Sequence, residues 1–266
     1  MNMKKLIMSL ALSLLFLMPA KSQDYDLGLY GGVTQYAGDL YPFLDNGLKN
    51  ALRGMRIAGG GLARLNLHPK FSLRGNLVIG YIAGYDRLSN GGTNLAPRNL
   101  SFHSPIIELS GVGEFHFMKY IHGVQRHNWS PFLYAGVGVT YFEPKTWQNG
   151  KRYNLRELET EVDKNYAPVT LAVPIGLGIK FAYKNYTITL ESGYRWTPTD
   201  YLDDVSGSAP VNALDHNLNP NATIDQQLAI RKRPPTVLRR GNPDKKDGYF
   251  VHGVTIAKTF RTYKCK

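Results

Sequence analysis

Two neighbouring stretches in the second half of the chain alternate regularly between large apolar residues and small or polar ones. From Val169 to Tyr183 every odd position is large and apolar, and every even position is small or polar. The alternation resumes from Tyr186 to Trp196 after a two-residue turn. A period of two residues is typical of a β-strand with one apolar and one polar face. Because these strands exceed the roughly five or six residues usual in globular proteins, and end in aromatic residues, they fit a lipid bilayer better than a soluble core.

The same alternation predicts eight strands along the chain. They lie near residues 25–36, 52–67, 71–85, 105–118, 130–142, 169–183, 186–196 and 248–260. Short connections alternate with long ones, and the longest are 86–104, 143–168 and 197–247. Outer-membrane barrels have short periplasmic turns and long outer loops, and an even strand number places both termini in the periplasm. The predicted fold is therefore all-β, an eight-stranded antiparallel up-and-down transmembrane β-barrel.

The first 22 residues have the pattern of a secretory signal peptide. Lys4 and Lys5 precede an apolar run, and Ala20-Lys21-Ser22 matches a small-x-small cleavage site. We expect residues 1–22 to be removed and residues 23–266 to form the barrel in the outer membrane. The chain has one cysteine, Cys265, so no internal disulfide is expected.

Soluble eight-stranded barrels of the lipocalin type are the alternative fold. Such a barrel would place its apolar residues inside. In the third and fourth predicted strands, however, glycines and charged residues share one face while large aliphatic residues occupy the other. A face rich in glycine and charge fits a narrow lumen, which favours the membrane barrel.

The predicted lumen contains a set of charged residues from different strands. They are Arg56, Arg64, Arg74, Glu108, Glu114, Lys180, Glu191 and Arg195. An eight-stranded barrel is only wide enough for its own side chains to fill, and an unpaired buried charge costs several kcal/mol. These residues predict a salt-bridged plug in preference to a gated ion path.

The sequence predicts no catalytic set, no cofactor site and no metal site. A barrel enzyme acting on lipid A would need a histidine with a serine or an acid near the lipid boundary. His252 falls on the lipid side, but no serine is adjacent to it in the sequence. The net charge of +12 is concentrated in part between Arg231 and Lys246, where lipopolysaccharide phosphates could bind, whereas nucleic acid is excluded by the compartment.

Two segments carry a resemblance to a known family. The first runs from Gly32 to Pro42 and contains Tyr-Ala-Gly-Asp-Leu, including Gly38 and Asp39. The second, Thr197 to Ser206, contains Thr-Asp-Tyr-Leu-Asp-Asp-Val-Ser. Its motif residues are Asp200, Tyr201, Asp203 and Asp204. Both segments resemble those of the PorG-like small outer-membrane barrels of Bacteroidota. The resemblance implies a part in type IX protein secretion, with a PorK-like lipoprotein and a PorN-like ring protein as partners.

The connection at 119–129 is the longest of the three short ones and is rich in aromatic and basic residues. Within it, Tyr120, Arg126 and Trp129 are the predicted docking residues for the periplasmic ring, although aromatic residues also favour headgroup positions. We therefore expect a non-enzymatic barrel that anchors or docks the ring. A lipid-A-modifying enzyme and a narrow pore or adhesive barrel are the alternatives.

Overall fold

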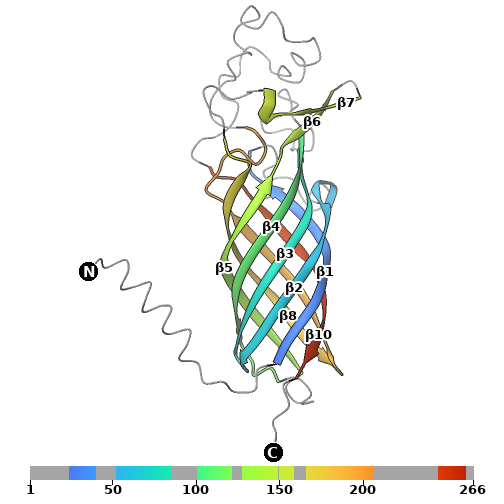
Figure 1. Cartoon of the computed structure of the whole chain (residues 1–266), viewed down its shortest axis with the longest axis vertical. Helices are drawn as coiled ribbons and strands as arrows, with labels where there is room; N and C mark the ends of the chain where they lie inside the picture. Colours follow the sequence, from blue (N-terminus) through green and yellow to red (C-terminus); the bar gives the residue numbers. More distant parts are fainter. Residues whose placement is uncertain are drawn as a thin grey trace, which may run out of the picture.

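The computed structural model describes residues 24–39, 52–85, 101–121, 128–148, 150–158, 166–205 and 245–261. Eight long strands form its wall. They are β1 (Asp24–Ala37), β2 (Arg56–His68), β3 (Phe71–Tyr85), β4 (Ser101–His116), β5 (Trp129–Phe142), β8 (Val169–Tyr183), β9 (Tyr186–Trp196) and β10 (Gly248–Phe260). Neighbouring strands are antiparallel, and β1 pairs with β10 to close the sheet (Figure 1). The prediction of a closed eight-stranded barrel is confirmed. The predicted signal peptide and Cys265 lie outside the described residues.

Both ends of the described chain lie at one end of the barrel, where β1 begins and β10 ends (Figure 1). The opposite end is elaborated. There the predicted loop 143–168 contains a hairpin of β6 (Lys145–Gln148) and β7 (Lys151–Asn154), followed by a 3₁₀ turn, η4 (Arg156–Leu158). Among the described residues no helix is long and apolar enough to cross a membrane.

Three strand limits differ from the prediction by more than one residue. β4 begins at Ser101 rather than 105, because residues 101–104 pair with the last residues of β3, as far as Tyr85. It also ends at His116 instead of 118. β2 begins at Arg56 rather than 52, because residues 52–54 form a helical turn in which the Met55 amide donates to the Leu52 carbonyl.

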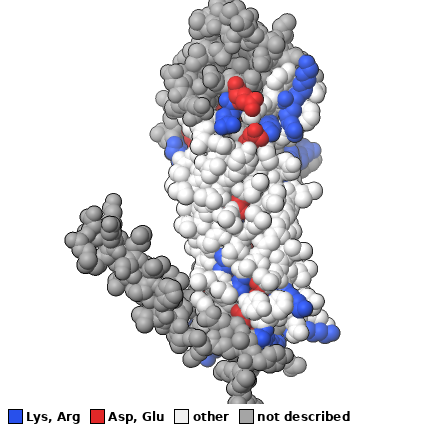
Figure 2. Space-filling model, in the orientation of Figure 1, with Lys and Arg blue, Asp and Glu red and all other residues white. Residues whose placement is uncertain are grey.

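The wall has its apolar face outside and its polar face inside. On β3, for example, Phe71, Leu73, Leu77, Ile79 and Tyr81 are exposed, whereas the positions that alternate with them are buried and mostly small or polar. On β8, the side chain of Leu177 is 61% exposed while Lys180 is fully buried in the lumen. Figure 2 shows a largely uncharged middle band, with Lys and Arg side chains gathered toward the two ends. This arrangement inverts a soluble barrel and requires apolar surroundings.

Aromatic residues border this apolar band at both ends. The two bordering aromatics are ten positions apart on β3 (Phe71, Tyr81), on β9 (Tyr186, Trp196) and on β10 (Phe250, Phe260). For strands tilted by about 40°, ten residues rise about 25 Å along the barrel axis, the height of the apolar band of outer-membrane barrels. The protein is therefore an integral β-barrel of the outer membrane.

Leu177→Arg tests the assignment of the lipid-facing wall. Leu177 lies near the middle of the apolar band, so the arginine should lower the free energy of unfolding by about 2–4 kcal/mol. Tyr183→Arg is the matched control, because it exposes the same charge on β8 at the rim and should cost only about 0–1 kcal/mol. Urea unfolding of the barrel in lipid vesicles measures both values. Equal costs at the two positions would contradict the assignment.

Candidate functional site

The centre of the lower lumen is the carboxylate of Glu114 on β4. It lies 3.0 Å from Nε of Arg64, 3.1 Å from Nε of Arg74 and 2.8 Å from Nζ of Lys180. All four side chains are buried. The three cations come from β2, β3 and β8, so this one carboxylate links strands on opposite sides of the barrel.

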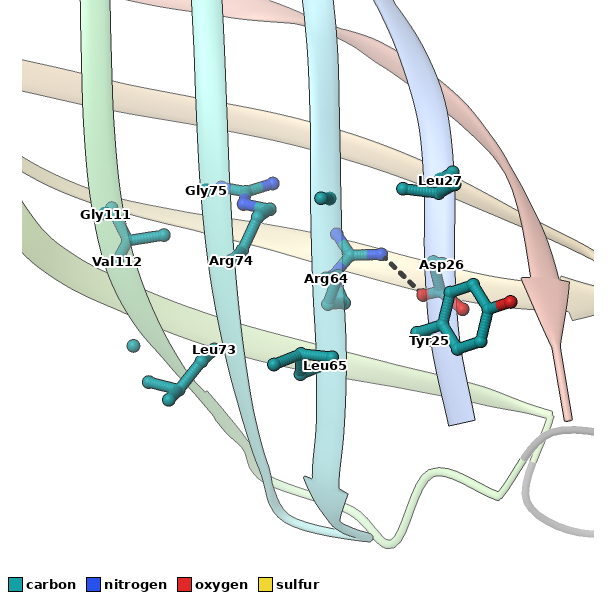
Figure 3. A pocket seen from close by; sticks show the side chains of 12 residues that line it. Tyr25, Asp26, Leu27, Arg64, Leu65, Leu73, Arg74, Gly75, Gly111 and Val112 are labelled. Carbon is teal, nitrogen blue, oxygen red and sulfur yellow. Dashed lines mark hydrogen bonds and ion pairs between the residues drawn. The ribbon is translucent and has the colours of Figure 1, made fainter. Parts of the chain in front are cut away.

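Two further carboxylates complete this cluster. Asp26 on β1 accepts from Arg64 Nη1 at 3.1 Å, and Glu191 on β9 pairs with Arg74. Figure 3 shows Arg64 reaching Asp26 on the neighbouring strand, with Arg74 beside it on β3. On the lipid side of β3 and β4, Gly75, Gly111 and Gly113 leave a depression, because a Cβ at any of them would meet no atom within 4 Å.

A second cluster fills the lumen above the first. Its carboxylate is Glu108, which accepts from Arg195 Nε at 3.3 Å and from the hydroxyls of Tyr249 and Ser110 at 2.8 Å each. Tyr249 also bonds Thr140 across the lumen at 2.8 Å. These bonds satisfy a buried carboxylate that would otherwise be costly.

The middle of the described lumen is charge-balanced. Its basic side chains are Arg64, Arg74, Lys180 and Arg195, and its acidic side chains are Asp26, Glu108, Glu114 and Glu191. Seven of these were predicted from the sequence. Asp26 was missed, although it lies on the polar side of the alternating Tyr25, Leu27 and Leu29.

Arg56 does not join either cluster, contrary to the prediction. It lies at the start of β2 near the elaborated end, where its guanidinium bonds Tyr85 Oη at 2.8 Å and the carbonyl of Met55 at 2.7 Å. The alternation correctly predicted that Arg56 is on the lumen-facing side of β2, but it gave no information about its position along the barrel axis. The predicted set of lumen residues, which includes Arg56, has more basic than acidic side chains. The observed set has Asp26 in place of Arg56 and is neutral.

Tyr120 closes the bottom of the lumen. It is only 6% exposed, its hydroxyl lies 3.0 Å from Thr187 Oγ1, and Lys180 Nζ lies 5.1 Å from the centre of its ring. The prediction that Tyr120 forms a docking surface is wrong, because the chain after β4 folds inward and buries the ring. Trp129 begins β5 on the lipid-facing rim, and Arg126 lies outside the described residues.

The two motif segments meet at the elaborated mouth. The Tyr36 hydroxyl at the end of β1 lies 2.6 Å from Asp203 Oδ2 and 2.6 Å from Asp247 Oδ1. The Asp39 amide donates to the same hydroxyl at 3.1 Å. A side chain at Gly38 would overlap the Tyr36 hydroxyl and the Asp247 carboxylate, so this position requires glycine.

The remaining motif residues fix the shape of the segment after β9. Asp203 Oδ1 accepts from the Val205 amide at 2.9 Å, and Asp204 accepts from the Tyr166 hydroxyl at 2.7 Å. Tyr201 stacks on Tyr166 with ring centres 4.8 Å apart. Asp200 is buried in the same region. Within the described residues no group of three or more His, Cys, Asp or Glu is arranged to hold a metal ion.

The contacts of the Tyr36 hydroxyl bear on the protonation of the two carboxyl groups at the mouth, Asp203 and Asp247. A tyrosine hydroxyl carries one hydrogen, so it can donate to only one of the two carboxyl groups. The other carboxyl must itself carry a proton and donate to the tyrosine oxygen. Burial is the main reason that the pKa of Asp203 and the pKa of Asp247 are raised well above the usual aspartate value. We call Tyr36, Asp203 and Asp247 the mouth latch.

One polar pair lies on the lipid side. Ser192 on β9 and His252 on β10 occupy opposite positions, and Ser192 Oγ lies 2.8 Å from His252 Nδ1. Because no serine is adjacent to His252 in the sequence, only the strand register reveals this pair. Among the described residues no carboxylate bonds to either side chain.

A closed barrel with a lipid-facing apolar wall and a filled lumen belongs to the class of small outer-membrane β-barrels. The chain is a member of the family described as a domain of unknown function, DUF6089, whose model matches residues 4–226. A comparison with curated proteins gave no match.

Several solved barrels are similar to this chain. The attachment invasion locus protein Ail of Yersinia pestis, solved with the heparin analogue sucrose octasulfate, has a TM-score of 0.41 and 10% identity, and covers 90% of this chain and 100% of its own. Neisserial surface protein A has a TM-score of 0.36 and 7% identity, with 90% and 100% coverage. The outer-membrane enzyme PagL has a TM-score of 0.28 and 14% identity, with 88% and 98% coverage. At these values the likeness carries no conclusion about function.

The mouth latch predicts that closure of the mouth depends on pH. Because the folded pKa values of Asp203 and Asp247 are raised, the stability that their bound protons contribute is fully present below the usual aspartate pKa of 3.8 and is lost as the pH rises through the raised values. The Leu202 amide donates to Asp247 Oδ2 at 3.0 Å, and the Val205 amide donates to Asp203 Oδ1. Hydrogen exchange of these two amides, corrected for intrinsic rates, should therefore show more frequent opening at pH 8 than at pH 5.

Asp203→Asn is the matched variant for this test, because asparagine keeps a hydrogen-bonding group without a titrating proton. It should flatten the dependence on pH. A native barrel whose two amides open equally often at both pH values would contradict the latch.

Proposed function

We propose that the protein is a non-enzymatic component of the type IX protein secretion system. In this role the barrel anchors or docks a periplasmic ring built from a PorK-like lipoprotein and a PorN-like protein. The observation that carries the proposal is the contact between the two motif segments. Gly38 and Asp39 lie against Tyr36, whose hydroxyl bonds Asp203, so the residues shared with PorG-like barrels act together.

The filled lumen supports a scaffolding role over a pore. Four cations and four anions are paired in the described mid-section, and Tyr120 lies across the bottom. Conduction would require breaking buried ion pairs, each of which is costly to separate. A narrow pore is therefore less well supported than a barrel that acts through its surfaces.

We assign the docking surface to exposed residues that follow β4. Met118, Lys119 and Ile121 are exposed at the end of the barrel that carries the short turns. Two apolar side chains around a lysine suit a protein contact better than open water. This surface replaces Tyr120, whose ring is buried.

A lipid-A-modifying enzyme remains the second candidate, and the Ser192–His252 pair is the observation in its favour. It lacks, among the described residues, a carboxylate that would orient His252 as triads require. Binding of lipopolysaccharide by the basic outer loop stays a prediction, because only Lys245 and Lys246 of that run are described.

The test uses affinity-tagged protein purified from the producing cells' outer membranes. The variant Met118→Ser, Lys119→Glu, Ile121→Ser should keep a heat-modifiable, membrane-inserted barrel but lose the co-purifying ring proteins and export less type IX cargo. Lys151→Ser, Arg152→Glu at the opposite end is the matched control and should behave like the native protein.

Two results would contradict the proposal. One is normal cargo export by a strain that lacks the gene. The other is the absence of ring proteins from preparations of the native barrel under conditions in which the ring itself stays assembled.

A further inference from the structure

Ser192 and His252 are polar residues in a part of the wall where the described outward-facing neighbours are aliphatic or aromatic. They lie on the outward-facing side of β9 and β10, with Leu190 and Val254 next to them toward the middle of the membrane. Polar side chains that face lipid are costly, and an ionisable residue within the membrane is by default a candidate functional site. Packing alone gives no reason for a histidine and a serine here.

The pair lies just inside the border of the apolar band. His252 is two positions from Phe250, the border aromatic of β10, whose ring stacks on the histidine at 5.6 Å. Ser192, opposite it, is two positions from Tyr194 and four from Trp196, the border aromatic of β9. Two residues of a tilted strand rise about 5 Å. This depth lies below the headgroups that the aromatic border meets, where the acyl esters of lipids join the hydrocarbon.

A groove of about 700 Å³ runs beside the pair along the lipid-facing wall. Its walls come from β1, β5, β8, β9 and β10 and include Leu177, Ile179 and Leu190. Gly31 keeps it open, because a Cβ there would meet no atom within 4 Å. The groove faces the bilayer, so an acyl chain is the group that lies against it.

One hydrogen-bond donor of the Ser192–His252 pair is left without an acceptor in the described protein. If the Ser192 hydroxyl donates to His252 Nδ1, the proton of a neutral imidazole is on Nε2 and faces away from the serine. If Nδ1 carries the proton and donates to the serine oxygen, the serine hydrogen is left over instead. Within the described part of the chain, no protein group bonds Nε2 of His252. In both tautomers an unused donor faces an environment without water.

We propose that Ser192 and His252 form a binding site for an ester-linked lipid of the outer membrane. One acyl chain of the lipid lies in the groove, and its ester carbonyl oxygen accepts the spare hydrogen bond of the pair. A lipid phosphate offers the same acceptor chemistry, but it lies farther out, at the level of the aromatic border. The site is independent of the secretion role, since it is on the wall and not at either end.

Native mass spectrometry of the purified barrel tests the site with two lipids of equal chain length. Ester-linked phosphatidylethanolamine has the carbonyl groups, whereas its ether-linked analogue keeps the phosphate and lacks them. The native barrel should retain the ester lipid about fivefold more strongly, the ratio expected of one net hydrogen bond. Ser192→Ala, His252→Phe should remove this preference while keeping the stacking on Phe250.

Val139→Ala is the control, because Val139 is lipid-facing on β5 and also lies two residues inside an aromatic border residue, Tyr141. It should keep the preference for the ester lipid. Ser192→Ala alone serves if the double variant does not show the heat-modifiable mobility of a folded barrel.

Equal retention of the two lipids by the native protein would overturn the proposal. Release of fatty acid from the ester lipid by the native barrel, lost in Ser192→Ala, would overturn it as well, because the pair would then hydrolyse the ester instead of holding it. Loss of the preference in the double variant, with no fatty acid released, supports the site.

Discussion

The contact of Glu114 with three cations is the interaction on which the rest of the barrel depends. A carboxylate in so narrow a lumen is tolerated only when its charge is matched, and Arg64, Arg74 and Lys180 match it from β2, β3 and β8. Asp26 and Glu191 then offset the two arginines. A slip of one residue in any of these strands would turn its charge toward the lipid. The charged lumen therefore specifies strand register as well as filling space.

A filled lumen restricts where this protein can act. Transport through the middle is opposed by paired charges, so the surfaces that remain are the two ends and the lipid-facing wall. At the elaborated end, Tyr36 joins the motif segments through Asp203 and Asp247. On the wall, the Ser192–His252 pair is the polar feature that the apolar band does not explain. Membership of DUF6089 leaves the choice among these surfaces to experiment.

The alternation of apolar and polar residues was sufficient to predict the barrel, its strand number and the side that each lumen charge faces. It could not give height along the axis, which is why Arg56 was grouped with the lumen charges. Asp26 was missed although the alternation places it on the lumen side. The alternation also gives no information about residues outside the strands. Tyr120, which follows β4, was therefore predicted to be exposed at the periplasmic surface. Contacts between strands far apart in sequence, such as Tyr36 with Asp247 or Ser192 with His252, depend on register and require the structure.

The free energy of unfolding of Glu114→Gln, of Lys180→Met and of the double variant tests the central claim, that charge balance in the lumen holds the barrel together. Each single variant leaves an uncompensated buried charge and should cost about 3–5 kcal/mol. The double variant leaves Arg64 and Arg74 with Asp26 and Glu191, so it should cost much less than the sum of the two. Additive costs in the double variant would contradict the claim.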